Sequence, residues 1–477
     1  MPRLLSLLFI AVLFPLPGWC WQPSTQRVPM IPREFRAAWV ACVYNIDWPS
    51  SKNLSAGAQK KEVQQILSKL SAMNMNAVLL QVRPNADAAY RSALEPWTHW
   101  ISGTMGRNPG YDPLQYWIQA AHARGIEVHA WFNPYRALPN FKTPAARNHV
   151  TRMKPGVIRR FKSSLWMDPA SRWTQQRTLQ VMMDVVRRYD IDGLHIDDYF
   201  YPYPQVNKQG RALQQFPDGK TPSQRRAAVD GFVQQMYSSV KRAKPWVRVG
   251  ISPFGIWRPG VPQGTTARID AYHHLAADSR KWLAKGWCDY LSPQLYWRIN
   301  SDQSYRLLLD WWKGQGPRPV WPGIAAARVK STEDPGRPAS EILNQAKMSR
   351  QNPRNYVGQV YWSMKSLMQN RGGVSQLLQR EFYQEPALVP PMPWSDQQRP
   401  ATPVTRVMER GGKTLVTWSR VRGCQKYAVQ ARYGGKWRLV KVLPGDSFAL
   451  SGQVEAVAVS AVSRSGMTSA PAVFQKN

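Results

Sequence analysis

Cysteine is scarce in this chain of 477 residues, which holds four: Cys20, Cys42, Cys288 and Cys424. No two of them form a CxxC pair, and their wide spacing argues against a disulfide framework or a zinc cluster. The sequence also lacks an HExxH segment and any His–Asp spacing typical of zinc enzymes. No GxGxxG follows a predicted strand, as a dinucleotide-binding fold would require. We therefore predict neither a metal site nor a cofactor.

Acidic residues are few as well, since 29 Asp and Glu stand against 64 Lys and Arg and give a net charge of +35. An excess of this size favours polyanionic partners, such as nucleic acid, anionic lipid or an acidic cell-wall polymer. The basic residues are dispersed, without a Lys/Arg-rich tail, a zinc finger, a helix-turn-helix or an RNP signature. We therefore predict that nucleic acid is not a partner, and we attribute the charge to the surface on which the protein works.

Long apolar runs are absent beyond the N-terminus. There, Arg3 precedes an apolar run of about 11 residues, which is too short to cross a bilayer and fits the core of a signal peptide. We predict a signal peptide over residues 1–20, an exported protein of the periplasm or cell envelope, and no membrane span. Cys20 is not expected to carry a lipid, because Trp19 stands where a small residue should precede a lipidated cysteine.

What the chain does contain is a series of short β-like runs, each followed by a stretch with helical periodicity. The predicted strands are Phe35–Val43, Ala77–Val82, Ile126–Phe132, Gly193–Asp197, Val247–Ser252, Tyr290–Tyr296, Val320–Ala325 and Val357–Tyr361. Helices are expected at Lys60–Met73, Asp112–Arg124, Arg172–Tyr189, Gln224–Ala243 and Tyr305–Lys313. Eight strand–helix units predict an α/β fold, a (β/α)8 TIM barrel over residues 33–384. A doubly wound open sheet is the alternative, but eight units favour closure.

The composition changes near Glu385. Residues 385–403, "EPALVPPMPWSDQQRPATP", are predicted to form a Pro-rich linker. From 404 to 477, apolar and polar residues alternate between turn signals, which predicts a small all-β sandwich. This part resembles a fibronectin type III domain with Trp418 and Tyr427 as core aromatics. It contains no acid pair, so we expect it to dock and not to catalyse.

The segment "GLHIDDYFYPYP", residues 193–204, ends a predicted strand with two adjacent acids. Its leucine and isoleucine share one strand face and pack against the helices, so His195 and Asp197 point to the barrel axis and Asp198 begins the loop. The same alternation brings to the axis Arg83, His129, Asn133, Gln294 and Tyr296. A purely structural core has no use for so many polar groups, because each needs a partner when buried.

A lining of this kind suits a sugar, whose hydroxyl and amide groups need planar donors and acceptors and whose faces stack on aromatic rings. Candidate substrate-binding aromatics in the following loops are Tyr199, Tyr201, Trp257 and Trp297. Arg83 and Arg136 are candidates to clamp the substrate. They are equally candidates to pair with Asp197, in which case they would lower its pKa and keep it ionised.

Glycoside hydrolysis generally requires two carboxyl groups, and Asp197 is the first candidate. The second is sought among Asp198, Asp278, Asp47 and Asp87. The alternative without a catalytic role is that the acid pair forms only a solvated turn, since Asp favours the ends of strands. The axial position of Asp197 argues against that alternative.

Several long blocks, among them "FRAAWVACVYNIDWP", "DGLHIDDYFYP" and "DSRKWLAKGWCDYLSPQLYW", resemble the glycosyl hydrolase-like 10 family, in order from about Phe35 to about Tyr383. Its members are exported bacterial (β/α)8-barrel proteins, and some are division-associated hydrolases of peptidoglycan glycan strands. The resemblance implies a glycosidase that acts on such strands, including those already stripped of peptide. It also implies a cell-division partner for the C-terminal domain.

The broader similarity of such barrels to α-galactosidases and α-amylases implies that Asp197, in a G-x-x-x-D context, is the nucleophile. Those enzymes carry a further acid after strand five or six, whereas "GISPFGIWR" and "SPQLYW" hold none here. The candidates for the general acid are therefore Asp198 and Asp278. To donate a proton, the carboxyl would need a pKa raised by burial or by the charge of Asp197.

The missing acid on strand five favours one alternative, a non-catalytic protein that binds cell-wall glycan. An exo-acting glycosidase of another exported polysaccharide is the other. Long loops after the second, third and fourth strands argue against it, because they predict an elongated cleft for a polymer. The sequence thus predicts a glycoside hydrolase whose partner is the peptidoglycan glycan strand.

Overall fold

The computed structural model describes residues 21–351 and 356–477, so the predicted signal peptide and Cys20 lie outside the described residues. Its central sheet has the strand order β10-β9-β8-β4-β3-β2-β12-β11, and every neighbouring pair is parallel. The strands are β2 (Phe35–Val40), β3 (Ala77–Arg83), β4 (Glu127–Phe132), β8 (Gly193–Ile196), β9 (Arg248–Ile251), β10 (Tyr290–Leu291), β11 (Gly323–Ile324) and β12 (Gly358–Tyr361).

The two edges of this sheet, β10 and β11, are joined by parallel bridges between Leu291 and Val320 and between Gln294 and Gly323. The sheet therefore closes, and the predicted eight-stranded (β/α)8 barrel is confirmed. The sixth and seventh strands are shorter than predicted. Prolines interrupt them, and a proline has no N–H to offer to a longer ladder.

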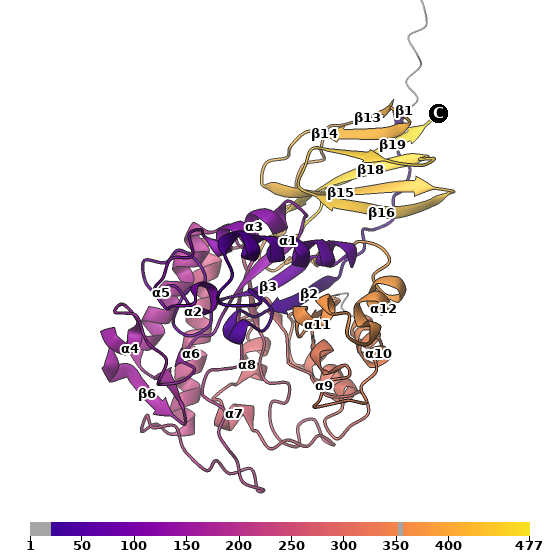
Figure 1. Cartoon of the computed structure of the whole chain (residues 1–477). Helices are drawn as coiled ribbons and strands as arrows, with labels where there is room; N and C mark the ends of the chain where they lie inside the picture. The colour runs from indigo at the N-terminus through magenta and orange to yellow at the C-terminus, as the bar shows by residue number, and fades with distance from the viewer. Residues whose placement is uncertain (1–20, 352–355) are drawn as a thin grey trace, which may run out of the picture.

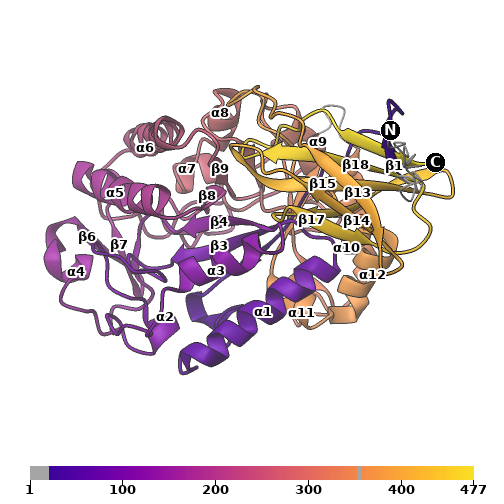
Figure 2. The same ribbon diagram turned by 90° about the horizontal axis from the view of Figure 1, so that it is seen from above.

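Helices surround the barrel on its outer face (Figures 1 and 2). The longer ones are α1 (Ala56–Ala72), α3 (Pro113–His122), α5 (Arg172–Arg188), α6 (Pro222–Ala243), α9 (Tyr305–Lys313), α10 (Ala339–Arg350) and α12 (Val374–Glu381). Shorter helices are α2 (His99–Ser102), α4 (Val150–Met153), α7 (Ala271–His274), α8 (Ser279–Ala284) and α11 (Met364–Met368). Local signals set their starts: Thr221 and Gln224 form a capping box at α6, and Pro113 follows the Asp112 cap of α3. No described helix is both long and apolar enough to span a bilayer.

The long connection between β4 and α5 contains a small antiparallel sheet in the order β5-β7-β6. Its strands are β5 (Arg136–Leu138), β6 (Ile158–Phe161) and β7 (Ser164–Met167). Figure 1 shows this insertion with α4 at the side of the barrel, away from the C-terminal strands. It therefore builds one flank of the barrel end at which the parallel strands finish.

The C-terminal part consists of two antiparallel sheets, in the orders β13-β14-β17 and β1-β19-β18-β15-β16. Their strands are β13 (Thr405–Arg410), β14 (Lys413–Trp418), β15 (Cys424–Tyr433), β16 (Lys436–Leu443), β17 (Ser447–Leu450), β18 (Ala456–Ser463), β19 (Ala472–Lys476) and β1 (Trp21–Pro23). Both sheets share one apolar core, in which the rings of Trp418 and Tyr427 lie 5.5 Å apart. The all-β domain is confirmed; its fibronectin type III character stays a prediction. The N-terminal strand β1 has no periodic signal and was not predicted.

The Pro-rich segment 385–403 is bound to both domains instead of spanning free space. Leu388 pairs with Arg33 in a parallel bridge, and Met392, which is fully buried, bonds to the carbonyl of Ser465. Figure 1 shows the C-terminal strands stacked over one end of the barrel. That end is the N-terminal end of the parallel strands, so the opposite end stays clear for a site.

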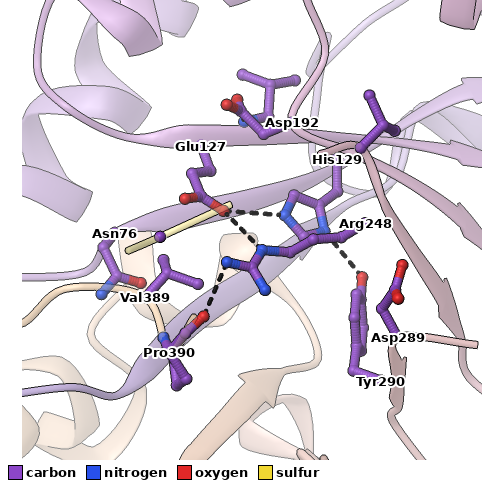
Figure 3. A network of polar contacts seen from close by, with 12 residues as sticks. Asn76, Glu127, His129, Asp192, Arg248, Asp289, Tyr290, Val389 and Pro390 are labelled. Atoms are coloured by element: carbon purple, nitrogen blue, oxygen red, sulfur yellow. Dashed lines mark hydrogen bonds and ion pairs between the residues drawn. The ribbon is translucent and has the colours of Figure 1, made fainter. Parts of the chain in front are cut away.

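A buried polar network closes this covered end (Figure 3). Glu127 lies 3.6 Å from Nε of Arg248 and 3.4 Å from Nε2 of His129, and Lys426 of the C-terminal domain reaches it at 3.1 Å. Arg248 also donates to the carbonyl of Pro390 at 2.8 Å. The network thus joins the barrel, the Pro-rich segment and the C-terminal domain through one carboxylate.

Replacing that carboxylate by Glu127→Gln is expected to destabilise the chain by about 3 kcal/mol at pH 7, because Lys426 and Arg248 would lose a buried counter-charge. Burial alone would raise the pKa of Glu127, but Lys426, His129 and Arg248 outweigh it and hold the pKa well below its usual range. The stabilisation is therefore present above the unfolded value near 4.5 and is lost as pH falls below it.

Urea unfolding of wild type and Glu127→Gln between pH 3 and 8 checks this, with the difference expected to shrink at the acid end. Glu333→Gln is the control, because Glu333 pairs with Arg328 at an exposed position and contributes little. A constant difference at all pH values would contradict the assigned charge.

Candidate active site

The acid pair lies at the uncovered end of the barrel, directly after β8. Leu194 and Ile196 are buried in the core under the helices, and His195 lies inside the barrel, as the strand alternation predicts. Gly193 is required at the start of this strand, because a Cβ there would lie 2.5 Å from the ring of His129. β8 therefore delivers Asp197 to the axis at its carboxyl end.

Asp197 is almost fully buried, with 4% of its surface exposed, and is held by donors from the neighbouring strand. Nε1 of Trp131 donates to it at 3.0 Å, and Nδ2 of Asn133 lies 3.2 and 3.3 Å from its two oxygens. The amide of Asn133 is itself fixed, because its oxygen accepts the backbone N–H of Arg136 at 2.9 Å. The carboxyl thus has a defined orientation before any ligand arrives.

The pKa of Asp197 is raised to about 7, first by burial and then by the charge of Asp198. Arg136, Trp131 and Asn133 act in the opposite direction but do not compensate. Our expectation of a lowered pKa is therefore corrected, since desolvation outweighs the single nearby cation.

Asp198 is also buried and accepts a hydrogen bond from the hydroxyl of Tyr203. Burial raises its pKa, and Tyr203 and Gln294 partly offset that rise. Gln294 is anchored by a 3.0 Å bond from Nε2 to the carbonyl of Ser252. Tyr296 lies near both acids, and burial followed by their charges raises the pKa of its hydroxyl.

Arg136 and a row of aromatic rings border the acid pair. The guanidinium of Arg136 lies 3.5 Å from the ring centroid of Tyr199. From there, ring contacts continue from Tyr199 to Tyr203 at 5.6 Å, to Phe254 at 6.0 Å and to Trp297 at 5.6 Å. These partly buried rings form a wall beside two carboxyl groups, and aromatic rings with carboxyl groups are the combination that suits a pyranose.

Eight of the predicted site residues are thus gathered around the acid pair or in its wall: Asn133, Arg136, Asp197, Asp198, Tyr199, Gln294, Tyr296 and Trp297. Three further residues contact the acids or their partners but were not predicted as site residues. Trp131 donates to Asp197, Tyr203 donates to Asp198, and Trp362 after β12 packs at 6.2 Å on Trp131. Trp131 has the same strand parity as His129 and Asn133, so its inward direction was detectable from sequence; for Trp362 there was no such signal.

The predicted role of Arg83 in substrate binding is corrected, because the structure gives this side chain other partners. It is fully buried, forms a bidentate ion pair with Glu95 and donates to the carbonyls of Asn133 and Pro134. Because Arg83 is fully buried and each of its three nitrogens already has a partner, it is not available to a substrate, and its carboxylate partner is Glu95 and not Asp197.

The two histidines predicted to bind substrate lie deeper in the barrel. His129 and His195 are fully buried, and both bond through Nδ1 to the hydroxyl of Tyr290, at 2.9 and 3.0 Å. His195 also bonds through Nε2 to Ser252. These contacts fill the barrel interior, so the alternation placed the side chains on the correct face but not at the correct depth.

Two predicted aromatics and the alternative acids have structural partners of their own. Tyr201 is buried and donates to Asp218, and Trp257 stacks on Trp311 at 6.0 Å. Asp278 caps the start of α8 by accepting the N–H of Lys281. The remaining acids are likewise engaged: Asp47 accepts from Ser363 at 2.6 Å, and Asp87 accepts the N–H of Asn85 at 2.9 Å. Asp278 is thus occupied as a helix cap, and Asp198 is the acid beside Asp197.

Within residues 21–351 and 356–477, no three His, Cys, Asp or Glu side chains gather in a way that would hold a metal ion. The chemistry that the site itself offers is that of two carboxyl groups, one guanidinium and several hydroxyl and amide groups.

Comparisons with known proteins agree with this chemistry. The family model described as "Glycosyl hydrolase-like 10" matches residues 34–335. Glycosyl hydrolase YngK of Bacillus subtilis (strain 168) is 39% identical over 401 residues, which cover 79% of this chain and 77% of that protein. Glycosyl hydrolase DigH of Escherichia coli (strain K12) is 35% identical over 332 residues, 61% of this chain and 71% of that one. Among solved structures, the PgaB (BpsB) glycoside hydrolase domain from Bordetella bronchiseptica has a TM-score of 0.47 and 15% identity, covering 72% of this chain and 98% of its own.

Proposed function

The chain belongs to the glycosyl hydrolase-like 10 family and is a glycoside hydrolase; we propose that it cleaves the glycan strands of bacterial peptidoglycan, including strands stripped of peptide. The observation that carries the proposal is the buried pair Asp197–Asp198 beside Arg136, under a wall of aromatic rings. Two carboxyl groups supply the nucleophile and the acid of a glycosidase, and the rings bind the sugar faces.

The hydrogen-bond partners support a division of roles between the two acids. The partners of Asp197 are an indole N–H and an amide NH₂, which only donate and therefore match an ionised carboxylate. The partners of Asp198 include the hydroxyl of Tyr203, which accepts as well as donates and therefore tolerates a protonated carboxyl, and the side chain of Gln294. We therefore assign Asp197 as the nucleophile and Asp198 as the proton donor, which requires that Asp198 keep its proton while Asp197 is ionised; burial of Asp198, which raises its pKa, favours this.

In the first step, an oxygen of Asp197 bonds to the anomeric carbon while the glycosidic C–O bond breaks and the leaving oxygen takes the proton of Asp198. In the second, Asp198 removes a proton from water, whose oxygen displaces Asp197 and restores the free enzyme. The product keeps the anomeric configuration of the substrate. Arg136 stabilises the ionised member of the pair throughout.

The charge of the chain supports a cell-wall polymer as substrate. A net charge of +35 favours a glycan that carries lactyl and peptide carboxylates, and binding of this kind weakens as salt screens the charges. We include export and location in the same proposal: the N-terminal segment directs export, and the protein works in the periplasm or cell envelope. The proposed role of the C-terminal domain is to bind a division partner.

Incubation of the purified full chain with peptide-free glycan strands, intact sacculi and chitin oligosaccharides tests the function, with soluble products followed by mass spectrometry. Release of sugars from the peptide-free strands, with retained anomeric configuration by NMR, is the expected result. Binding to strands without release would support instead a non-catalytic glycan-binding protein. Release from an unrelated exported polysaccharide alone would support the exo-glycosidase.

A further inference from the structure

A cavity of about 630 Å³ lies between the connection from β8 to α6 and the connection from β9 to α7. Its lining includes Lys208, Arg211, Arg268, Asp270, His273 and His274; we call it the basic cavity. Both connections follow the carboxyl ends of their strands, so the basic cavity is at the same end of the barrel as the acid pair.

Three cationic side chains line the basic cavity without an internal counter-charge. In the part of the chain that the structure describes, neither Lys208 nor Arg211 nor Arg268 forms an ion pair. The one lining acid, Asp270, is engaged elsewhere, since it pairs with Arg258 at 3.1 Å and caps α7. The basic cavity therefore presents uncompensated positive charge, which an anion would balance.

A second, smaller cavity adjoins the basic cavity and is lined in part by residues next to Tyr203. It shares the lining residues His273 and His274 with the basic cavity and is also lined by Pro202 and Pro204. Between these two prolines lies Tyr203, whose hydroxyl bonds to Asp198. The smaller cavity therefore adjoins both the basic cavity and the segment that holds the partner of the proton donor.

We propose that the basic cavity binds the carboxylate of a muramic-acid lactyl group on the glycan strand. This inference rests on the proposed function and names the group by which the strand is recognised. An arginine guanidinium binds a carboxylate with two parallel hydrogen bonds, and the basic cavity offers two arginines. Removal of the stem peptide converts the lactyl amide into a charged carboxylate, so the basic cavity selects strands stripped of peptide.

A binding experiment with matched sugars tests this directly. The full chain with Asp197→Asn, to prevent turnover, is titrated calorimetrically with a muramic-acid-containing tetrasaccharide of peptide-free strands and with chitotetraose, which lacks the lactyl group. We expect at least tenfold tighter binding of the former. Adding Arg211→Gln and Arg268→Gln together is expected to reduce that preference to less than threefold, while Arg306→Gln, an exposed arginine on α9, leaves it unchanged.

Equal binding of the two sugars, binding of neither, or a preference that survives the double substitution would overturn the proposal. Inorganic phosphate is the third probe: binding of phosphate without a preference for the muramic sugar would assign the basic cavity to a free anion and overturn the lactyl assignment. Hydrolysis separates this proposal from the function. Wild type that cleaves peptide-free strands with a KM unaffected by the double substitution would retain the function and reject the role of the basic cavity.

Discussion

Asp197→Asn is expected to lower kcat on peptide-free glycan strands by about 10³-fold or more, because the amide cannot attack the anomeric carbon. The substitution keeps the shape of the side chain, so the barrel is expected to remain folded. Wild-type kcat/KM is expected to rise with pH toward about 7, where Asp197 becomes ionised. Product release measured by mass spectrometry across pH 5 to 9 checks both statements.

Stability provides an independent readout of the same carboxyl. Its pKa is raised from 3.8 to about 7, so between these values the folded chain binds more protons than the unfolded chain and loses stability as pH rises. Asp197→Asn removes this cost and is expected to resist urea better than wild type at pH 8, with no such advantage at pH 3. Asp278→Asn is the control, expected to change activity little because Asp278 caps α8. Full activity in Asp197→Asn would reject the assigned role.

Arg83→Met is expected to destabilise the chain by about 3–5 kcal/mol, because it leaves the carboxylate of Glu95 buried without its partner. Urea unfolding at pH 7 measures the effect. A second substitution, Glu95→Leu, made together with Arg83→Met, is expected to recover part of the loss, since the pair is then replaced by apolar groups. Among molecules that remain folded, KM is expected to be unchanged. A raised KM at unchanged stability would restore the substrate-binding role predicted from the sequence.

The barrel was predictable because its signals are local. Short runs rich in apolar residues mark the strands, and cap residues such as Asp112 and Thr221 mark helix starts within a few positions. The position of Asp197 at the axis followed from the alternation of side chains along its strand. The closing contact between β10 and β11 followed only from counting eight units, because prolines reduce both strands to short pairs.

The partners of the polar side chains were not predictable in the same way. Alternation gives the face of a strand, so Arg83, His129 and His195 were all expected at the site. Their partners in the folded chain give them structural roles instead. Glu95, in the loop after the second barrel strand, pairs with Arg83, and the hydroxyl of Tyr290 from the sixth strand bonds to both histidines. These contacts join residues far apart in the sequence, and no local pattern encodes them.

The pKa of Asp197 likewise depends on groups that the sequence reveals and on burial that only the tertiary structure reveals. The sequence places an arginine and a second acid near it, but the direction of the shift depends on how much water the folded site excludes. Burial outweighs Arg136, and only the packed barrel could establish that. By itself, the sequence determined the fold class, the family resemblance and the adjacent acids, because strand alternation and contiguous motifs are short-range properties. The tertiary structure alone decided which polar side chains surround those acids, which of them are already paired, and where an uncompensated basic cavity opens at the same end of the barrel. These features depend on distances between segments and on exclusion of solvent.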